Sequence, residues 1–147
     1  MNIAQCLATI DLLCAREFPA VPGRTEFGTA GPGFHIAELE TSGDFHEDDG
    51  TEREETEAQY ERDKDGLAER LTERWGAPRD FSLYSVFERS TEGEELAEPW
   101  ASLSSHVPDV HLWKSTDTGR WIALGVSQWD TELPFQLLAV VTAVAPE

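Results

Sequence analysis

Apolar residues recur at three- and four-residue spacing near the start of the chain. The stripe consists of Ile3, Leu7, Ile10 and Cys14, and it is widened by Cys6 and Leu13. This spacing predicts a helix over residues 2–17 with one buried face. Cys6 and Cys14 lie too far apart along such a helix to form a disulfide, so we expect two free, buried thiols.

A second stripe of apolar residues follows an acidic stretch. It contains Tyr60, Leu67, Leu71 and Trp75, separated by seven, four and four residues. We expect one long helix that ends before the glycine and proline that follow Trp75. The segment 51–54 fits a capping box, in which a threonine begins the helix and a glutamate reaches back to it.

The remaining pattern predicts strands. A short strand is expected at 34–41 and an inner strand at 81–89, where both faces are apolar. Segments 110–115 and 120–128 flank a four-residue turn and predict a hairpin. The nearly unbroken apolar run 135–144 is typical of a strand covered on both faces. The chain therefore predicts an α+β fold in the order α-β-α-β-β-β-β, with a mainly antiparallel sheet and two helices on one face.

The length of 147 residues suits one domain, 1–147. Glycine and proline concentrate in 19–33, which predicts a flexible loop, and acidic residues concentrate in 42–51, which predicts an acidic loop. No apolar run approaches the roughly 20 residues that cross a bilayer, and residues 1–5 carry no basic flank of a signal peptide. We expect a soluble, cytoplasmic protein that does not bind membranes.

The charge of the chain is concentrated in one segment. Between Glu38 and Asp65 there are thirteen carboxylates and three basic side chains, Arg53, Arg62 and Lys64, which accounts for ten of the eighteen excess negative charges. Such a field repels nucleic acid and favours a basic protein surface as the partner. The candidate binding carboxylates are Asp44, Glu47, Asp48, Asp49, Glu54, Glu57 and Glu61.

Tryptophans form a second cluster in the sequence. Four of the five, Trp100, Trp113, Trp121 and Trp129, fall within thirty residues. Rings of this size either pack a small sheet or form an exposed platform for a ligand. We include them among the candidate binding residues and leave both interpretations open.

The polar residues between 104 and 111 resemble parts of a catalytic or metal site. They include His106, Asp109 and His111. A proline breaks any helix through them, alternation separates His106 from the other two, and the chain has no Gly-x-Ser-x-Gly nucleophile elbow. The acidic segment beginning at Asp44 lacks the EF-hand register. We therefore assign no catalytic residue, no metal ligand and no cofactor.

Two segments carry a resemblance. They are LTERWGAPRDFSLYSVFERS at 71–90 and PWASLSSHVPDVHLWKSTDTGRWIALGVSQWDTELPFQLLAVV at 99–141. Both resemble functionally uncharacterised small acidic proteins of high-GC actinobacteria. The resemblance implies no activity and assigns no role to any residue.

These observations lead to two function hypotheses. The first is a non-enzymatic acidic protein-interaction module, of the immunity or antitoxin type, that inhibits a basic partner. The alternative is a small-ligand-binding protein or hydrolase that uses the Trp-rich sheet with His106, Asp109 and His111. Mimicry of DNA by regularly spaced carboxylates is a third. A homodimer would follow if the hairpin strand 121–128 lay at the edge of the sheet.

Overall fold

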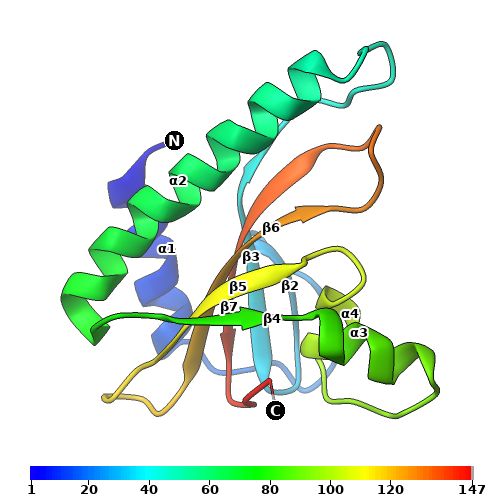
Figure 1. Ribbon diagram of the computed structural model, residues 1–147. Coiled ribbons are helices and arrows are strands. Elements are labelled where there is room, and N and C mark those ends of the chain that lie inside the picture. Colours follow the sequence, from blue (N-terminus) through cyan, green and yellow to red (C-terminus); the bar gives the residue numbers. More distant parts are fainter. Residues whose placement is uncertain (147) are drawn as a thin grey trace.

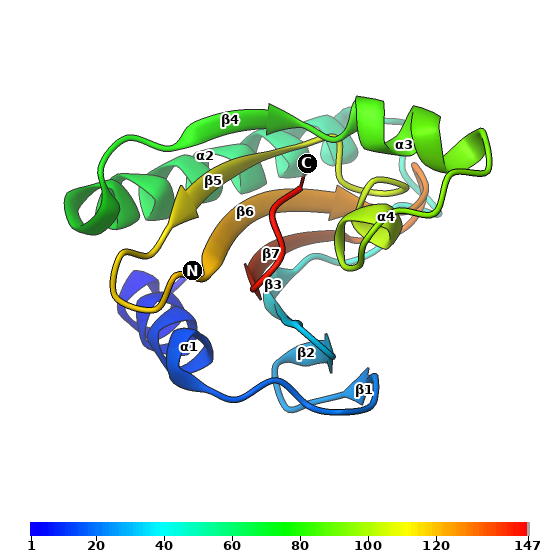
Figure 2. The same ribbon diagram turned by 90° about the horizontal axis from the view of Figure 1, so that it is seen from below.

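The computed structural model describes residues 1–146 and shows one curved sheet with helices on both faces (Figures 1 and 2). The elements in chain order are α1 (Ile3–Ala15), β1 (Gly23–Arg24), β2 (Gly28–Gly31), β3 (Phe34–Thr41), α2 (Thr51–Trp75), β4 (Arg79–Ser82), α3 (Tyr84–Thr91), α4 (Trp100–Leu103), β5 (Asp109–Lys114), β6 (Trp121–Gln128) and β7 (Phe135–Thr142).

All seven strands belong to one antiparallel sheet in the order β1-β2-β3-β7-β6-β5-β4. The predicted α+β class with an antiparallel sheet is confirmed, although the sheet has seven strands instead of the five expected. Strands β5, β6 and β7 are joined as consecutive hairpins, as the sequence indicated. Strand β3 pairs with β7, with Phe34 opposite Thr142. Because β6 lies between β5 and β7, the hairpin strand expected to pair with a second copy at a sheet edge is interior, and that route to a homodimer is excluded.

Helices α1 and α2 cover one face of the sheet. Ile10 of α1 and Leu71 of α2 pack against alternate residues of the inner strands, among them Ile122, Leu124 and Val141. Strand side chains alternate between faces, so these positions face the helices while Ala123 and Val140 face the opposite way. One apolar face on each helix is buried, as predicted. In α1, Cys6, Ile10 and Leu13 are buried, while Ile3, Leu7 and Cys14 are partly buried and pack against the same core.

The start of α2 differs from the predicted capping box. The helix begins at Thr51, but its N-cap is Gly50, which has a positive φ of 103°. Asp48 accepts hydrogen bonds from the amides of Glu52 and Arg53 at 3.1 and 2.9 Å. An aspartate thus supplies the acceptor that we expected from the threonine hydroxyl, and its charge also suits the positive end of the helix dipole.

The opposite face is covered by α3 and α4, which the sequence did not predict. Segment 81–89 was expected to be an inner strand, but only its beginning belongs to β4, and the rest is α3. Leu83 and Val86 are buried against Trp100 and Leu103 of α4, whereas Tyr84 and Phe87 are exposed. The prediction was wrong because two exposed aromatic side chains made the outer face of a short amphipathic helix look like the second buried face of a strand.

The glycine- and proline-rich segment 19–33 is more ordered than the predicted loop. It contains β1 and β2, and β2 pairs with β3 in a regular antiparallel ladder. A Cβ on Gly28 would lie 2.5 Å from the Ile36 carbonyl oxygen, so glycine is required for this close approach. Segment 42–50 is an acidic loop, as predicted, between β3 and α2. None of the helices within residues 1–146 has the length and apolarity needed to cross a membrane.

Candidate functional site

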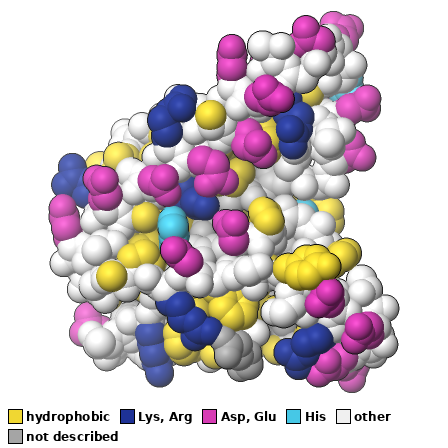
Figure 3. Space-filling view, viewed as in Figure 1, with side chains coloured by type: hydrophobic (Ala, Val, Ile, Leu, Met, Phe, Trp, Pro, Cys, Tyr) yellow, Lys and Arg dark blue, Asp and Glu magenta, His cyan; other side chains and the backbone are white. Residues whose placement is uncertain are grey.

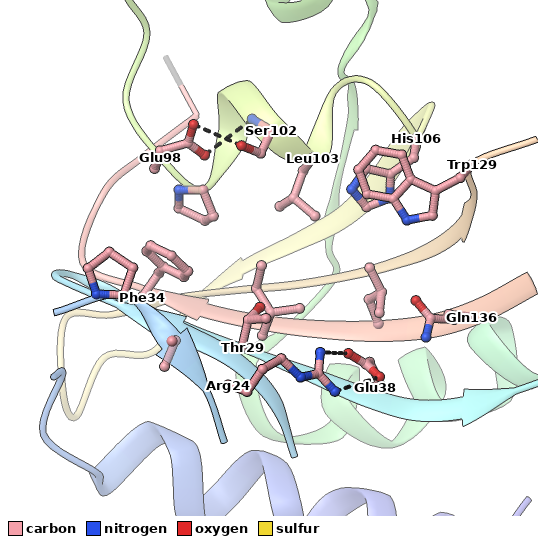
Figure 4. A pocket seen from close by; sticks show the side chains of 16 residues that line it. Arg24, Thr29, Phe34, Glu38, Glu98, Ser102, Leu103, His106, Trp129 and Gln136 are labelled. Atoms are coloured by element: carbon pink, nitrogen blue, oxygen red, sulfur yellow. Dashed lines mark hydrogen bonds and ion pairs between the residues drawn. The ribbon is translucent and has the colours of Figure 1, made fainter. Parts of the chain in front are cut away.

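A cleft of about 610 Å³ lies between α4 and the strands β1, β2, β3 and β7 (Figure 4). The sheet curves between β4 and β1, and α4 lies inside this curve whereas α1 lies outside it (Figure 2). Because α3 and α4 cover only the inner strands of this face, the β1–β3 end of the sheet remains open opposite α4.

Strand periodicity determines which side chains form the floor. Along β3, Phe34, Ile36 and Glu38 face the cleft, while His35 and Ala37 point to the α1 side, where both are buried. Along β7, Gln136 and Leu138 face the cleft in the same way. Leu103 and Pro99 of the α4 segment form the opposite wall. The cleft is therefore mainly apolar, with polar groups around it.

Two of the polar groups around the cleft, Arg24 and Glu38, form an ion pair and neutralise each other. The guanidinium of Arg24 donates to both oxygens of the Glu38 carboxylate, at 2.7 and 3.5 Å. The pKa of Arg24 is raised by this hydrogen bond and by the charge of Glu38. The pair connects β1 to β3 along one side of the cleft (Figure 4).

Glu98 lies on the α4 side of the cleft. Its carboxylate accepts from the Ser102 hydroxyl at 2.9 Å and from the Ser102 amide at 3.2 Å. No Lys, Arg or His within residues 1–146 forms an ion pair with it. Glu98 therefore carries an uncompensated negative charge at the cleft.

His106 and Trp129 stack at one end of the cleft, with their ring centroids 3.7 Å apart and their planes at 18° (Figure 4). Nδ1 of His106 lies 2.6 Å from the Ser127 hydroxyl oxygen. Burial lowers the pKa of His106 to about 4, so the ring is neutral near pH 7. Trp129 is 59% exposed despite its size.

A serine hydroxyl beside an imidazole, as in Ser127 and His106, is the arrangement of a nucleophile and its general base. The environment of this pair argues against that role. Ser127 is only 1% exposed, so a substrate cannot approach its hydroxyl. Ser104 and Ser105 donate their hydroxyl hydrogens to carbonyl groups of the α4 segment. The three serines near His106 are thus held in structural hydrogen bonds.

The structure does not bring together all three residues that the alternative hypothesis placed in one site. His106 and Asp109 both line a second hollow, of about 430 Å³, but His111 does not. His111 lies on the α2 side of the sheet, where Nδ1 is 2.6 Å from Asp80 and Nε2 is 3.3 Å from Asp65. Asp109 lies on the same side, 3.6 Å from the ammonium of Lys64. A hydrolase or ligand site that joins the three residues is therefore not assembled in this fold.

The tryptophans are likewise divided between the two faces. Trp113 is buried on the α2 side and donates to the Gly76 carbonyl at 3.0 Å. Trp100 is buried on the other side and donates to the Val144 carbonyl at 2.8 Å. Trp121 is partly buried with Lys114 over its ring, 5.3 Å from the centroid. Only Trp129 of these four is exposed, so the expected tryptophan platform is reduced to one ring.

The acidic candidates gather where the 42–50 loop meets the start of α2. We call residues 42–57 the acidic protrusion; this end of α2 extends beyond the sheet, and Asp and Glu side chains surround it (Figures 1 and 3). Asp44, Glu47, Glu54 and Glu57 are exposed. Asp48 caps α2, and the pKa of Asp49 is lowered by hydrogen bonds from Thr51.

Farther along α2 the negative charge is partly neutralised. Lys64 is only 4% exposed, and its ammonium lies 2.8 Å from Glu61. Burial lowers the pKa of Lys64, but the hydrogen bond that its ammonium donates to Glu61 and the charges of Glu61, Asp109 and Asp65 outweigh burial and raise it overall. Glu61 therefore belongs to a structural ion pair as well as to the acidic surface.

Among the described residues, neither the cleft nor the acidic protrusion contains a cluster of metal-ligating side chains. Within residues 1–146 no three His, Cys, Asp or Glu side chains converge in a way that could hold a metal ion. Cys6 and Cys14 are free thiols, and burial raises the pKa of both. Cys6 is buried as expected, whereas Cys14 is only partly buried.

Sequence reasoning missed most of the cleft. Arg24 fell in the expected loop, and Glu98 and Gln136 carried no pattern that distinguished them. Two lining residues, His106 and Trp129, were among the sequence candidates. The strand expected at 34–41 implied by alternation that Ile36 and Glu38 share a face.

Comparisons with known proteins found nothing similar: no family model, curated protein or solved structure matches the chain. The assignment of function therefore depends on the geometry and charge of the cleft and of the acidic protrusion.

Proposed function

We propose that the chain is a non-enzymatic protein-interaction module that binds a basic protein through the acidic protrusion, and that it acts as an inhibitor of the immunity or antitoxin type. The observation that carries this proposal is the charge of residues 42–57, which contain eight carboxylates and one basic side chain, Arg53.

Arg53 does little to offset the negative electrostatic potential that the protrusion presents to solvent. Its guanidinium donates to the Gln128 side chain at 3.2 and 2.8 Å and lies 5.5 Å from the Phe135 ring centroid. The nearest Glu57 oxygen is 3.8 Å away. The guanidinium of Arg53 is thus turned toward the sheet, and seven of the eight acidic residues of the protrusion are exposed.

The protrusion is also held in place, which lowers the entropy lost on binding. Phe45 is buried against Phe135, and its amide donates to the Glu132 carbonyl at 2.8 Å. A fixed acidic surface attracts a basic partner over about one Debye length, roughly 8 Å at physiological ionic strength. Association should therefore be fast and should weaken as salt increases.

Charge-neutralising variants test this proposal. Glu54→Gln/Glu55→Gln removes two exposed carboxylates from the protrusion, and Glu92→Gln/Glu95→Gln removes two from the exposed segment after α3. Both variants have the same net charge, so only the position of the lost charge differs.

Each tagged protein is incubated with native lysate at low salt, and the captured basic protein is purified and titrated calorimetrically at two ionic strengths. The protrusion variant should bind several-fold more weakly, the control should match the wild type, and the activity of the partner should fall on binding. Capture of no basic protein, or equal binding by both variants, would refute the proposal.

A further inference from the structure

The cleft on the other side of the sheet has chemistry that the acidic protrusion does not use. Its volume of about 610 Å³ falls within the range of small-molecule sites, roughly 300–1,000 Å³. Ile36 and Leu138 supply an apolar floor, and Leu103 faces them from α4. An apolar body of limited size is therefore the part of a ligand that this space accommodates.

Trp129 gives one end of the cleft a preference for a cationic group of a ligand. One face of its indole is covered by the neutral ring of His106, and the residue is nevertheless 59% exposed. The face of an indole carries negative electrostatic potential, and tryptophan is the strongest aromatic partner of a cation.

The chain's own cations do not occupy this ring. The cation–π contacts within residues 1–146 pair Arg16 with Phe27, Arg53 with Phe135, Arg79 with Phe81, Lys114 with Trp121, and Arg120 with Phe18. Trp129 takes part in none of these contacts, so its exposed surface remains accessible to a cation from outside.

The charges of the cleft favour the same kind of ligand. Arg24 is engaged by Glu38, so it offers no free positive charge to an anion. Glu98 has no cationic partner within residues 1–146. The local excess is one negative charge, and the net charge of the whole chain, −18, also opposes an anionic ligand.

We infer that the cleft between α4 and β1–β3 binds a small organic cation, with its positive group over the indole of Trp129 and its apolar body against Ile36, Leu103 and Leu138. The carboxylate of Glu98 determines the sign of the charge that the cleft accepts, because Glu38 is already paired with Arg24.

The test compares three aromatic probes that differ in charge: benzyltrimethylammonium, its neutral carbon isostere neopentylbenzene, and benzenesulfonate. Binding is followed by ligand-observed NMR and tryptophan fluorescence. The cation should bind roughly five- to thirtyfold more tightly than the isostere, which corresponds to a cation–π contribution of this kind. The sulfonate should not bind.

Variants locate the bound cation. Trp129→Leu keeps an apolar side chain and should abolish the preference for the cation, whereas Trp129→Phe should retain part of it. Arg24→Gln frees the Glu38 carboxylate and should tighten binding about two- to threefold, since one exposed ion pair is worth up to about 1 kcal/mol. Tyr84→Leu, which changes an exposed aromatic residue outside the cleft, is the control and should bind like the wild type.

Two results would overturn the inference: equal affinity for the cation and its isostere, or unchanged cation affinity in Trp129→Leu. If benzyltrimethylammonium bound only to the acidic protrusion, its affinity would be unchanged in Trp129→Leu and would fall in Glu54→Gln/Glu55→Gln. The cleft and the protrusion use different residues, so either proposal can fail without the other.

Discussion

Replacing Gly125 with alanine tests how closely β6 packs against the chain that enters β5. A Cβ on Gly125 would lie 2.7 Å from Cγ1 of Val107, 3.1 Å from Cγ1 of Val110 and 3.2 Å from the Asp109 carbonyl oxygen. Carbon atoms in favourable contact lie about 3.5–4.0 Å apart, so both buried valines would have to move. Overpacking of this kind lowers the free energy of unfolding by about 1–3 kcal/mol.

Gly66→Ala is the matched control, because it adds the same methyl group where no atom lies within 4 Å. Gly66 lies inside α2, where alanine is favoured over glycine by about 0.5–1 kcal/mol. With a urea m-value of about 2 kcal/mol per molar, the unfolding midpoint should fall by roughly 0.5–1.5 M for Gly125→Ala and rise by roughly 0.3–0.5 M for Gly66→Ala. A Gly125→Ala protein as stable as the wild type would refute the close packing described here.

Three further predictions concern burial and charge. Desolvation raises the pKa of the partly buried Cys14 to about 11 and also raises that of the buried Cys6, so both thiols should react slowly with a thiol reagent at pH 8 when folded and rapidly in denaturant. Immediate labelling of both thiols in the folded protein would contradict this expectation. Burial lowers the pKa of His106 from 6.5 to about 4, so the unfolded state binds a proton at this residue more readily than the folded state does. A contribution of up to about 3 kcal/mol to the free energy of unfolding, present above pH 6.5, should therefore be lost as the pH falls toward 4. Urea unfolding of wild type and His106→Asn at pH 4.5 and 7 should show a smaller pH effect in the variant, and equal effects would argue against this shift. Finally, sodium and calcium chloride at equal ionic strength should raise the melting temperature equally by screening the eighteen excess charges, and a rise of several degrees at micromolar calcium would reveal a specific site.

Elements with one clear periodicity were predictable from the sequence. Residues 34–41 form β3 as expected, and the helical stripe of α1 and the long stripe ending at Trp75 lie in helices with the predicted buried faces. The turn between 115 and 120 joins β5 to β6 as predicted. In each case local spacing and a terminating residue agree with the tertiary packing.

Short elements were not predictable because their local patterns are ambiguous. In α3, Tyr84 and Phe87 face solvent and conceal the helical spacing of Leu83 and Val86. At the start of α2, the capping box predicted Thr51 as the acceptor, but the fold of the preceding loop brings Asp48 to the amides of Glu52 and Arg53 instead.

The cleft could not be predicted because it is a product of topology. Its walls come from residues 22–38, 98–106 and 129–138, which are far apart in the sequence. The stack of His106 on Trp129 joins positions 23 residues apart at the open end of the β5–β6 hairpin. The hairpin was predictable, but the side of it that would face a hollow was not. The acidic protrusion, by contrast, is one continuous segment, and its charge was evident from composition alone.

The central position of β7 determines when the sheet can form. β7 follows the other six strands in the sequence, yet it is the strand that joins β1-β2-β3 to β6-β5-β4. During synthesis on the ribosome, the two halves of the sheet cannot connect until residues 135–142 have emerged. Pairing of Phe34 with Thr142 closes a loop of more than a hundred residues, and such distant contacts slow folding. The open edges of β3 and β6 are thus exposed in the nascent chain, at the stage when a chaperone would have most effect on its yield.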